Sequence, residues 1–215
     1  MSSVKEARWV GRTALGFRAG RGGSVVVGVT AGGRGPCVVL STFLATAADG
    51  DRLSLEPFHM AAGIARGAQG EVSAEAAAVV AEGRKRQDRL AAENLARMIL
   101  GLRNSGCKPA IAALLVNRAG WINDLLQYSL GAPEHPPVAE GLAVRDALRF
   151  AFRACDIESV EMDEKSLPEA AATALGMSPA DIDARLKELG ATAGKPWRKE
   201  QKLACLSAWL AATAR

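Results

Sequence analysis

Two adjacent acids, Asp163 and Glu164, are the residues of this sequence whose types and spacing are best suited to catalysis. A pair of carboxylates can bind a divalent cation, or one carboxyl can donate a proton while the other accepts one. A structural role competes with that chemistry. Both acids precede a predicted helix that begins at Ser166, and negative charge stabilises a helix N-terminus. The pair is therefore a candidate catalytic site with a plain structural alternative.

A candidate ligand site follows the apolar run "AIAALLV" at residues 110–116, which predicts a strand buried on both faces. Asn117, Arg118 and Asp124 come after this strand, and open α/β sheets bind ligands at the carboxyl ends of their strands. The same residues could instead form an asparagine turn and a helix cap. If the protein binds a small molecule, we expect its pocket at residues 117–124.

The cysteines and histidines argue against a zinc or redox site. The four cysteines and two histidines are widely spaced, and no C-x-x-C motif occurs. We therefore expect no resident cofactor. No apolar run reaches the ~20 residues that cross a bilayer, and the N-terminus lacks a signal-peptide core. These features predict a soluble, cytoplasmic protein that does not bind membranes.

Positive charge is concentrated near the N-terminus. The formal net charge is +4, and residues 1–23 carry the whole excess, because basic and acidic residues balance in the rest of the chain. This pattern predicts a basic arm over residues 1–23 and a single domain over residues 24–215. A basic arm can neutralise nucleic-acid phosphates, although it can equally be a solvated tail. The candidate phosphate contacts are Arg8, Arg12, Arg18 and Arg21 in the arm and Arg84 and Lys85 on a predicted long helix.

The elements that position these residues follow from β-branched runs, turn signals and helical periodicity. Strands are predicted at residues 24–30, 37–46 and 52–58, joined by tight turns. A long helix over residues 73–105 and the apolar strand 110–116 follow. Helices at 121–130 and 138–155, a weak strand at 157–163 and helices from residue 166 onwards complete the chain. The order β-β-β-α-β-α-β-α predicts an α/β domain with a mixed central sheet flanked by helices.

Three stretches of the chain, "VVVGVTAGGRGPCVVL", "SVEMDEKSLPEAA" and "EQKLACLSAWLA", carry a family resemblance. In order and spacing they resemble the ribonuclease H-like superfamily, and within it the RuvC-type and YqgF-type Holliday-junction resolvases. The first is similar to the family's first hairpin, where a hydrophobic run ends in Gly-x-Asp and a glycine turn. The third is similar to the closing helix. The second is similar to the YqgF motif Asp-Glu-Arg-x-Ser/Thr, represented here by Asp163, Glu164, Lys165 and Ser166.

The resemblance implies a chemistry for which this sequence lacks several residues. In the family, carboxylates from the first strand, a central strand and the last helix bind two divalent cations that promote phosphodiester cleavage. The corresponding positions here hold Thr30, Asn117 and Lys202, and Glu200 is the acid nearest to the last of them. Neutral side chains cannot replace bridging carboxylates, and a lysine repels a cation.

The resemblance therefore implies a catalytically degenerate ribonuclease H-like protein that binds DNA or RNA, or else a partner protein or a second copy of itself. Two alternatives stay open. One is a Mg²⁺- or Mn²⁺-dependent nuclease that uses Asp163, Glu164 and Glu200. The other is a small-molecule enzyme with its pocket at residues 117–124. The residues that we expect to contact a ligand are Thr30, Asn117, Arg118, Asp124 and Lys202.

Overall fold

A five-stranded mixed sheet forms the centre of the computed structural model, which describes residues 12–32, 35–65, 72–117 and 121–214. The strand order is β3-β2-β1-β4-β5. Neighbours β1 and β2, and β2 and β3, are antiparallel, whereas β4 is parallel to both β1 and β5. The strands are β1 (Arg12–Gly20), β2 (Gly23–Gly32), β3 (Gly35–Ala45), β4 (Pro109–Val116) and β5 (Glu158–Asp163). The predicted mixed sheet flanked by helices is confirmed.

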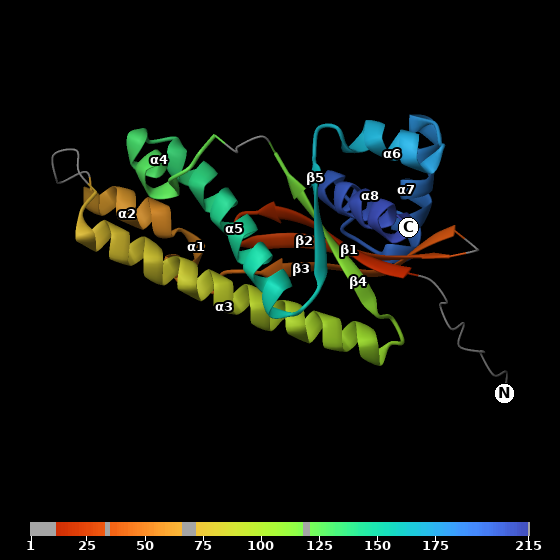
Figure 1. Cartoon of the computed structure of the whole chain (residues 1–215), viewed down its shortest axis with the longest axis horizontal. Coiled ribbons are helices and arrows are strands. Elements are labelled where there is room, and N and C mark those ends of the chain that lie inside the picture. The colour runs from red at the N-terminus through yellow and green to blue at the C-terminus, as the bar shows by residue number, and fades with distance from the viewer. Residues whose placement is uncertain (1–11, 33–34, 66–71, 118–120, 215) are drawn as a thin grey trace.

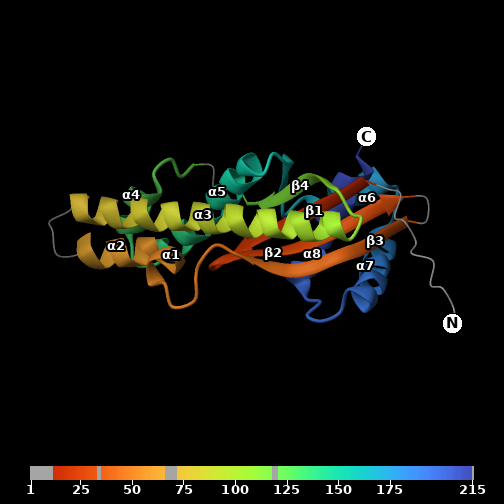
Figure 2. The same ribbon diagram turned by 90° about the horizontal axis from the view of Figure 1, so that it is seen from below.

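Two layers of helices enclose this sheet (Figure 1). One face is covered by α3 (Ala74–Asn104) and α5 (His135–Ala154), and the other by α6 (Leu167–Leu175), α7 (Pro179–Ala193) and α8 (Lys199–Thr213). Figure 2 shows the long α3 running past the end of the strands. There it packs against α1 (Arg52–Leu55) and α2 (Pro57–Ala65), with α4 (Leu125–Gly131) beside them. None of the helices in the described ranges is long and apolar enough to cross a membrane.

The side chains of β4 explain how one strand joins the two layers. Ala112 and Leu114 point into the core under α3 and α5, whereas Leu115 packs into the core under α6, α7 and α8. All three are at most 1% exposed. A strand covered on both faces needs apolar residues at every position rather than at alternate ones. The predicted central strand at residues 110–116 is therefore confirmed.

The first strand of the sheet begins earlier than the sequence pattern predicted. Residues 12–20, expected in the basic arm, form β1, so the strands predicted at 24–30 and 37–46 are the second and third strands. The positive charges of Arg12 and Arg18 led to the prediction that this segment is a solvated basic arm. In the fold, Arg12 lies 3.8 Å from Glu158 and Arg18 lies 3.0 Å from Glu164, and the residues of β1 between them are largely buried.

The third predicted strand, at residues 52–58, is wrong, because these residues are helical in α1 and α2. The carboxylate of Asp51 accepts a hydrogen bond from the backbone N–H of Leu53 and so caps α1. Pro57 stands at the first position of α2, where its missing N–H costs nothing. These local signals outweigh the alternating pattern of the segment.

Gly16 allows β1 to lie directly against α8. A Cβ atom on Gly16 would overlap the carbonyl oxygen of Ala204 and lie 2.5 Å from Oγ of Ser207, both on α8. We therefore expect Gly16→Ala to lower the free energy of unfolding by about 3 kcal/mol, since helix and sheet would have to move apart. Gly20→Ala is the matched control, because a Cβ there meets nothing within 4 Å. Equal urea midpoints for the two variants would contradict this close contact.

Candidate functional site at the carboxyl ends of the parallel strands

Arg18 occupies the centre of a charged cluster at the carboxyl ends of the parallel strands. It lies near the end of β1, in register with Leu115 of β4, which pairs with Met162 of β5. Its Nε and Nη2 donate hydrogen bonds of 3.1 and 3.0 Å to the two carboxylate oxygens of Glu164. Its Nη1 lies 3.9 Å from Oε1 of Glu200 on α8. One guanidinium therefore bridges acids that lie far apart in the sequence.

The turn after β5 fixes Glu164 in this position. The backbone N–H of Glu164 donates to the carbonyl of Val116, at the end of β4. The preceding residue, Asp163, accepts hydrogen bonds on Oδ1 from the backbone N–H groups of Lys165 and Ser166. It thus caps the turn that leads into α6, which is the structural role considered for it. Glu164 contacts Arg18 directly in the charged cluster.

Thr30, predicted to stand at the position of the family's first-strand acid, lies on the second strand of the chain, β2. Strand β1 carries Arg18 two residues before its end at Gly20, in the order Gly16, Phe17, Arg18. Thr30 is 3% exposed, and its hydroxyl is hydrogen-bonded to that of Thr13 at 2.8 Å. The Thr30 hydroxyl is thus buried and hydrogen-bonded within the sheet.

The charged cluster does not fit a pair of divalent cations. A cation between Glu164 and Glu200 would meet the guanidinium of Arg18, which already contacts both carboxylates. Among the described residues, no group of three or more Asp, Glu, His or Cys side chains is placed to hold a metal ion. Lys202 does not enter the cluster, because its Nζ pairs with Asp183 of α7 at 3.2 Å.

A pocket of about 460 Å³ opens near the end of β4, between α3, α4 and α5. Asn117 and Asp124, two of the predicted ligand contacts, line it. Asp124 also caps α4, since its Oδ1 accepts from the backbone N–H groups of Leu126 and Gln127. Part of the stretch 117–124, where a small-molecule pocket was predicted, thus lines this cavity. Arg118 lies outside the described residues.

Three arginines line the same pocket, and only two of them have acidic partners among the described residues. Arg84 and Arg149 each donate a 2.8 Å hydrogen bond to Asp146, and Arg149 also binds Glu161 at 2.6 Å. Arg145 on α5 donates from Nη1 to the neutral amide oxygen of Asn117. Its Nε is buried and finds no partner in the part of the chain described. Burial lowers the pKa of Arg145.

Sequence reasoning missed Arg145 and Arg149 as site residues. Their signal was present: they stand four residues apart on a helix whose other face is apolar, so both project from the same side. What the pattern could not show is which element faces that side. The packing of α5 against the end of β4 supplies that information.

The other predicted phosphate contacts do not gather on one surface. Arg12 and Arg18 lie at opposite ends of β1, and Arg21 pairs with Glu56 at 3.0 Å. Lys85 is exposed on α3, whereas Arg84 faces the pocket. Arg8 is outside the described residues, in which basic and acidic side chains are equal in number. The net positive charge therefore comes from the remaining residues.

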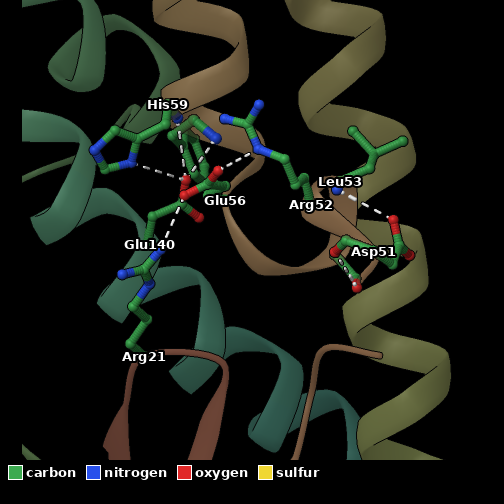
Figure 3. Close-up of polar contacts among 9 residues, drawn as sticks. Arg21, Asp51, Arg52, Leu53, Glu56, His59 and Glu140 are labelled. Atoms are coloured by element: carbon green, nitrogen blue, oxygen red, sulfur yellow. Dashed lines mark hydrogen bonds and ion pairs between the residues drawn. The ribbon is translucent and has the colours of Figure 1, made fainter. Parts of the chain in front are cut away.

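A second buried polar cluster surrounds Glu140 of α5 (Figure 3). Its Oε1 accepts from the backbone N–H groups of Phe58 and His59, at 2.7 and 3.1 Å, at the start of α2. Nδ1 of His59 lies 3.8 Å from the same oxygen. Oε2 is buried without a hydrogen-bond partner among the described residues. Burial raises the pKa of Glu140 to about 7, although the two backbone bonds oppose the shift.

Comparison with known proteins shows a likeness in fold. No family model and no curated protein sequence matches the chain. The structure of RuvC from Thermus thermophilus superposes with a TM-score of 0.51 over 92% of both chains, at 10% identity. T. thermophilus RuvC in complex with a Holliday junction substrate gives a TM-score of 0.51 at 10% identity, over 93% of this chain and 91% of the other. The chain has the RuvC-like, ribonuclease H-like fold.

Proposed function

We propose that this protein binds nucleic acid through a RuvC-like fold without cleaving it. The observation that carries the proposal is the bidentate contact between Arg18 and Glu164 at the carboxyl ends of the parallel strands. Two-metal cleavage needs carboxylates that bridge cations at this place. Here a fixed cation of the protein pairs with Glu164 and Glu200, two of the three candidate acids.

Two observations support nucleic acid as the partner. The similar fold of T. thermophilus RuvC has been seen with a Holliday junction substrate. Residues 1–23 carry a formal charge of +4, and Arg8 is one of their basic residues. A basic segment of this kind can neutralise phosphates. The sheet and its helices then act as a scaffold for recognition.

Binding and cleavage can be measured on the same DNA substrates. We expect fluorescence anisotropy to show binding to a four-way junction, a duplex or a single strand, weakening as salt rises, with no cleavage in Mg²⁺ or Mn²⁺. Arg8→Gln should reduce the slope of log K against log salt by about 1, because each lost phosphate contact removes about one released counterion. Lys187→Gln is the control, since Lys187 is paired with Asp183 on α7.

Two results would contradict the proposal. Cleavage that disappears in Glu164→Gln would show that the acids still serve a nuclease. Failure to bind any of the three DNA forms or the matching RNA would remove nucleic acid as the partner and favour a protein partner.

A further inference from the structure

We infer that the pocket between α3, α4 and α5 binds a phosphate ester, with Arg145 as the residue that contacts the phosphate. The inference goes beyond nucleic-acid binding by the fold, because it assigns a ligand class and an anchoring residue to one cavity.

Arg145 is the arginine of the pocket lining that forms no ion pair with another described residue. Asp146 and Glu161 pair with Arg84 and Arg149, and the third acid of the lining, Asp124, accepts hydrogen bonds from the backbone at the start of α4. Glu164, the other acid near Arg145, is held in the bidentate contact with Arg18. A partly buried cation without an anionic partner is unfavourable in a folded protein. The site is therefore arranged for an anion that comes from outside the described fold.

Hydrogen bonding at Arg145 points the same way. The guanidinium donates one hydrogen bond, from Nη1, to the neutral amide oxygen of Asn117, and its buried Nε has no acceptor among the described residues. Buried donors are nearly always satisfied in native structures, so an open one calls for a ligand or water. A guanidinium presents parallel donors that match the oxygens of a phosphate.

The remaining walls favour an ester over inorganic phosphate. The pocket holds about 460 Å³, within the range of small-molecule sites. Polar groups form the larger part of its lining, and the apolar side chains that form the rest give an organic group a surface to pack on. These apolar side chains are Phe58, Val80, Ile122, Leu125, Leu126 and Leu142. A phosphate ester with an organic group of nucleoside size could contact both Arg145 and the apolar side chains of the pocket.

Calorimetric titration with nucleoside monophosphates tests the site directly. We expect the full-length protein to bind at least one of the common ribonucleoside monophosphates with a Kd tighter than about 1 mM, and to bind the matching nucleoside more weakly. Arg145→Gln should weaken the nucleotide at least about tenfold, because it removes a charge-assisted contact. Arg153→Gln removes the same charge from an exposed position on α5 and should leave the affinity unchanged.

A structural role for Arg145 predicts different results. Arg145→Lys keeps the positive charge but loses the fork, so it should fold and still bind more weakly than the wild type. If all monophosphates fail to bind, or if Arg145→Gln binds them as well as the wild type does, the inference is wrong. Circular dichroism of each variant shows whether a loss of binding reflects unfolding; should Arg145→Gln unfold, the affinity of Arg145→Lys decides.

The same phosphate chemistry could come from a free nucleotide or from a nucleic-acid chain. A 5′-phosphorylated oligonucleotide that displaces the nucleotide, and needs Arg145 to do so, identifies the chain as the source. If the oligonucleotide binds equally well to the wild type and to Arg145→Gln, while the nucleotide requires Arg145, the free nucleotide is the ligand of this pocket. Either result supports the phosphate site, and DNA binding that fails altogether would count only against the proposed function.

Discussion

Replacing Arg18 with aspartate is expected to turn the charged cluster into a divalent-cation site. The change removes a guanidinium and adds a carboxylate near Glu164 and Glu200, so the local charge falls by two units. Three carboxylates on β1, after β5 and on α8 would then face one another, which is a suitable donor set for Mg²⁺ or Mn²⁺. Without metal, their repulsion should raise their pKa values and destabilise the fold.

Calorimetry with Mn²⁺ should show one or more sites in Arg18→Asp with a Kd of about 10⁻⁴–10⁻³ M and none in the wild type. Added Mn²⁺ should raise the thermal midpoint of the variant, since saturation at 100 times Kd stabilises a protein by about 2.7 kcal/mol. Arg18→Lys preserves the positive charge and is the matched control. Binding of Mn²⁺ by the wild type with equal affinity would show that Arg18 does not block the site, and the nuclease alternative would regain its support.

The sequence predicted the architecture better than the place of its first strand. The apolar run over β4 and the alternation of helices after it were enough to predict a mixed sheet with helices on both faces. Strand β1 was lost because Arg12 and Arg18 looked solvated. In the fold, Arg12 and Arg18 have acidic partners in Glu158 and Glu164 of the β5 region. That pairing is a tertiary contact that no local pattern contains.

The candidate site shows the same division between local and tertiary information. Asn117 and Asp124 could be predicted because they follow a buried strand, and ligand sites favour that position. Arg145 could not, because its importance comes from the lack of an acidic partner among the described residues after α5 has packed. Likewise, Glu164 was recognised as a candidate acid, but its neutralisation by Arg18 requires the register of β1 against β4.

Glu140 should make the stability of the protein fall as the pH rises from about 4.5 to about 7. Its side chain is 7% exposed, and its pKa in the fold is about 7 against an ordinary value of 4.5. Because the folded pKa is the higher one, the contribution of Glu140 is fully present below pH 4.5 and is lost as the pH rises to about 7. A shift of this size corresponds to about 3 kcal/mol.

Glu140→Gln isolates this term, because the amide does not titrate. Its oxygen can still accept from the N–H groups of Phe58 and His59, while its NH₂ group replaces the unpartnered Oε2 at a cost that does not change with pH. Urea denaturation between about pH 4.5 and 8.5 should therefore show the variant gaining about 3 kcal/mol relative to the wild type.

The groups that face Glu140 set the limits of this prediction. Glu56, which is itself paired with Arg21 and Arg52, raises the pKa of Glu140, whereas the positive charge of Arg21 lowers it. The exposed Glu134 at the start of α5 supplies the control Glu134→Gln, whose profile should run parallel to the wild type. If the unfolding free energies of Glu140→Gln and the wild type changed in parallel with pH, the prediction would be wrong. The carboxylate of Glu140 would then be solvated in the folded protein, by water or by a local movement.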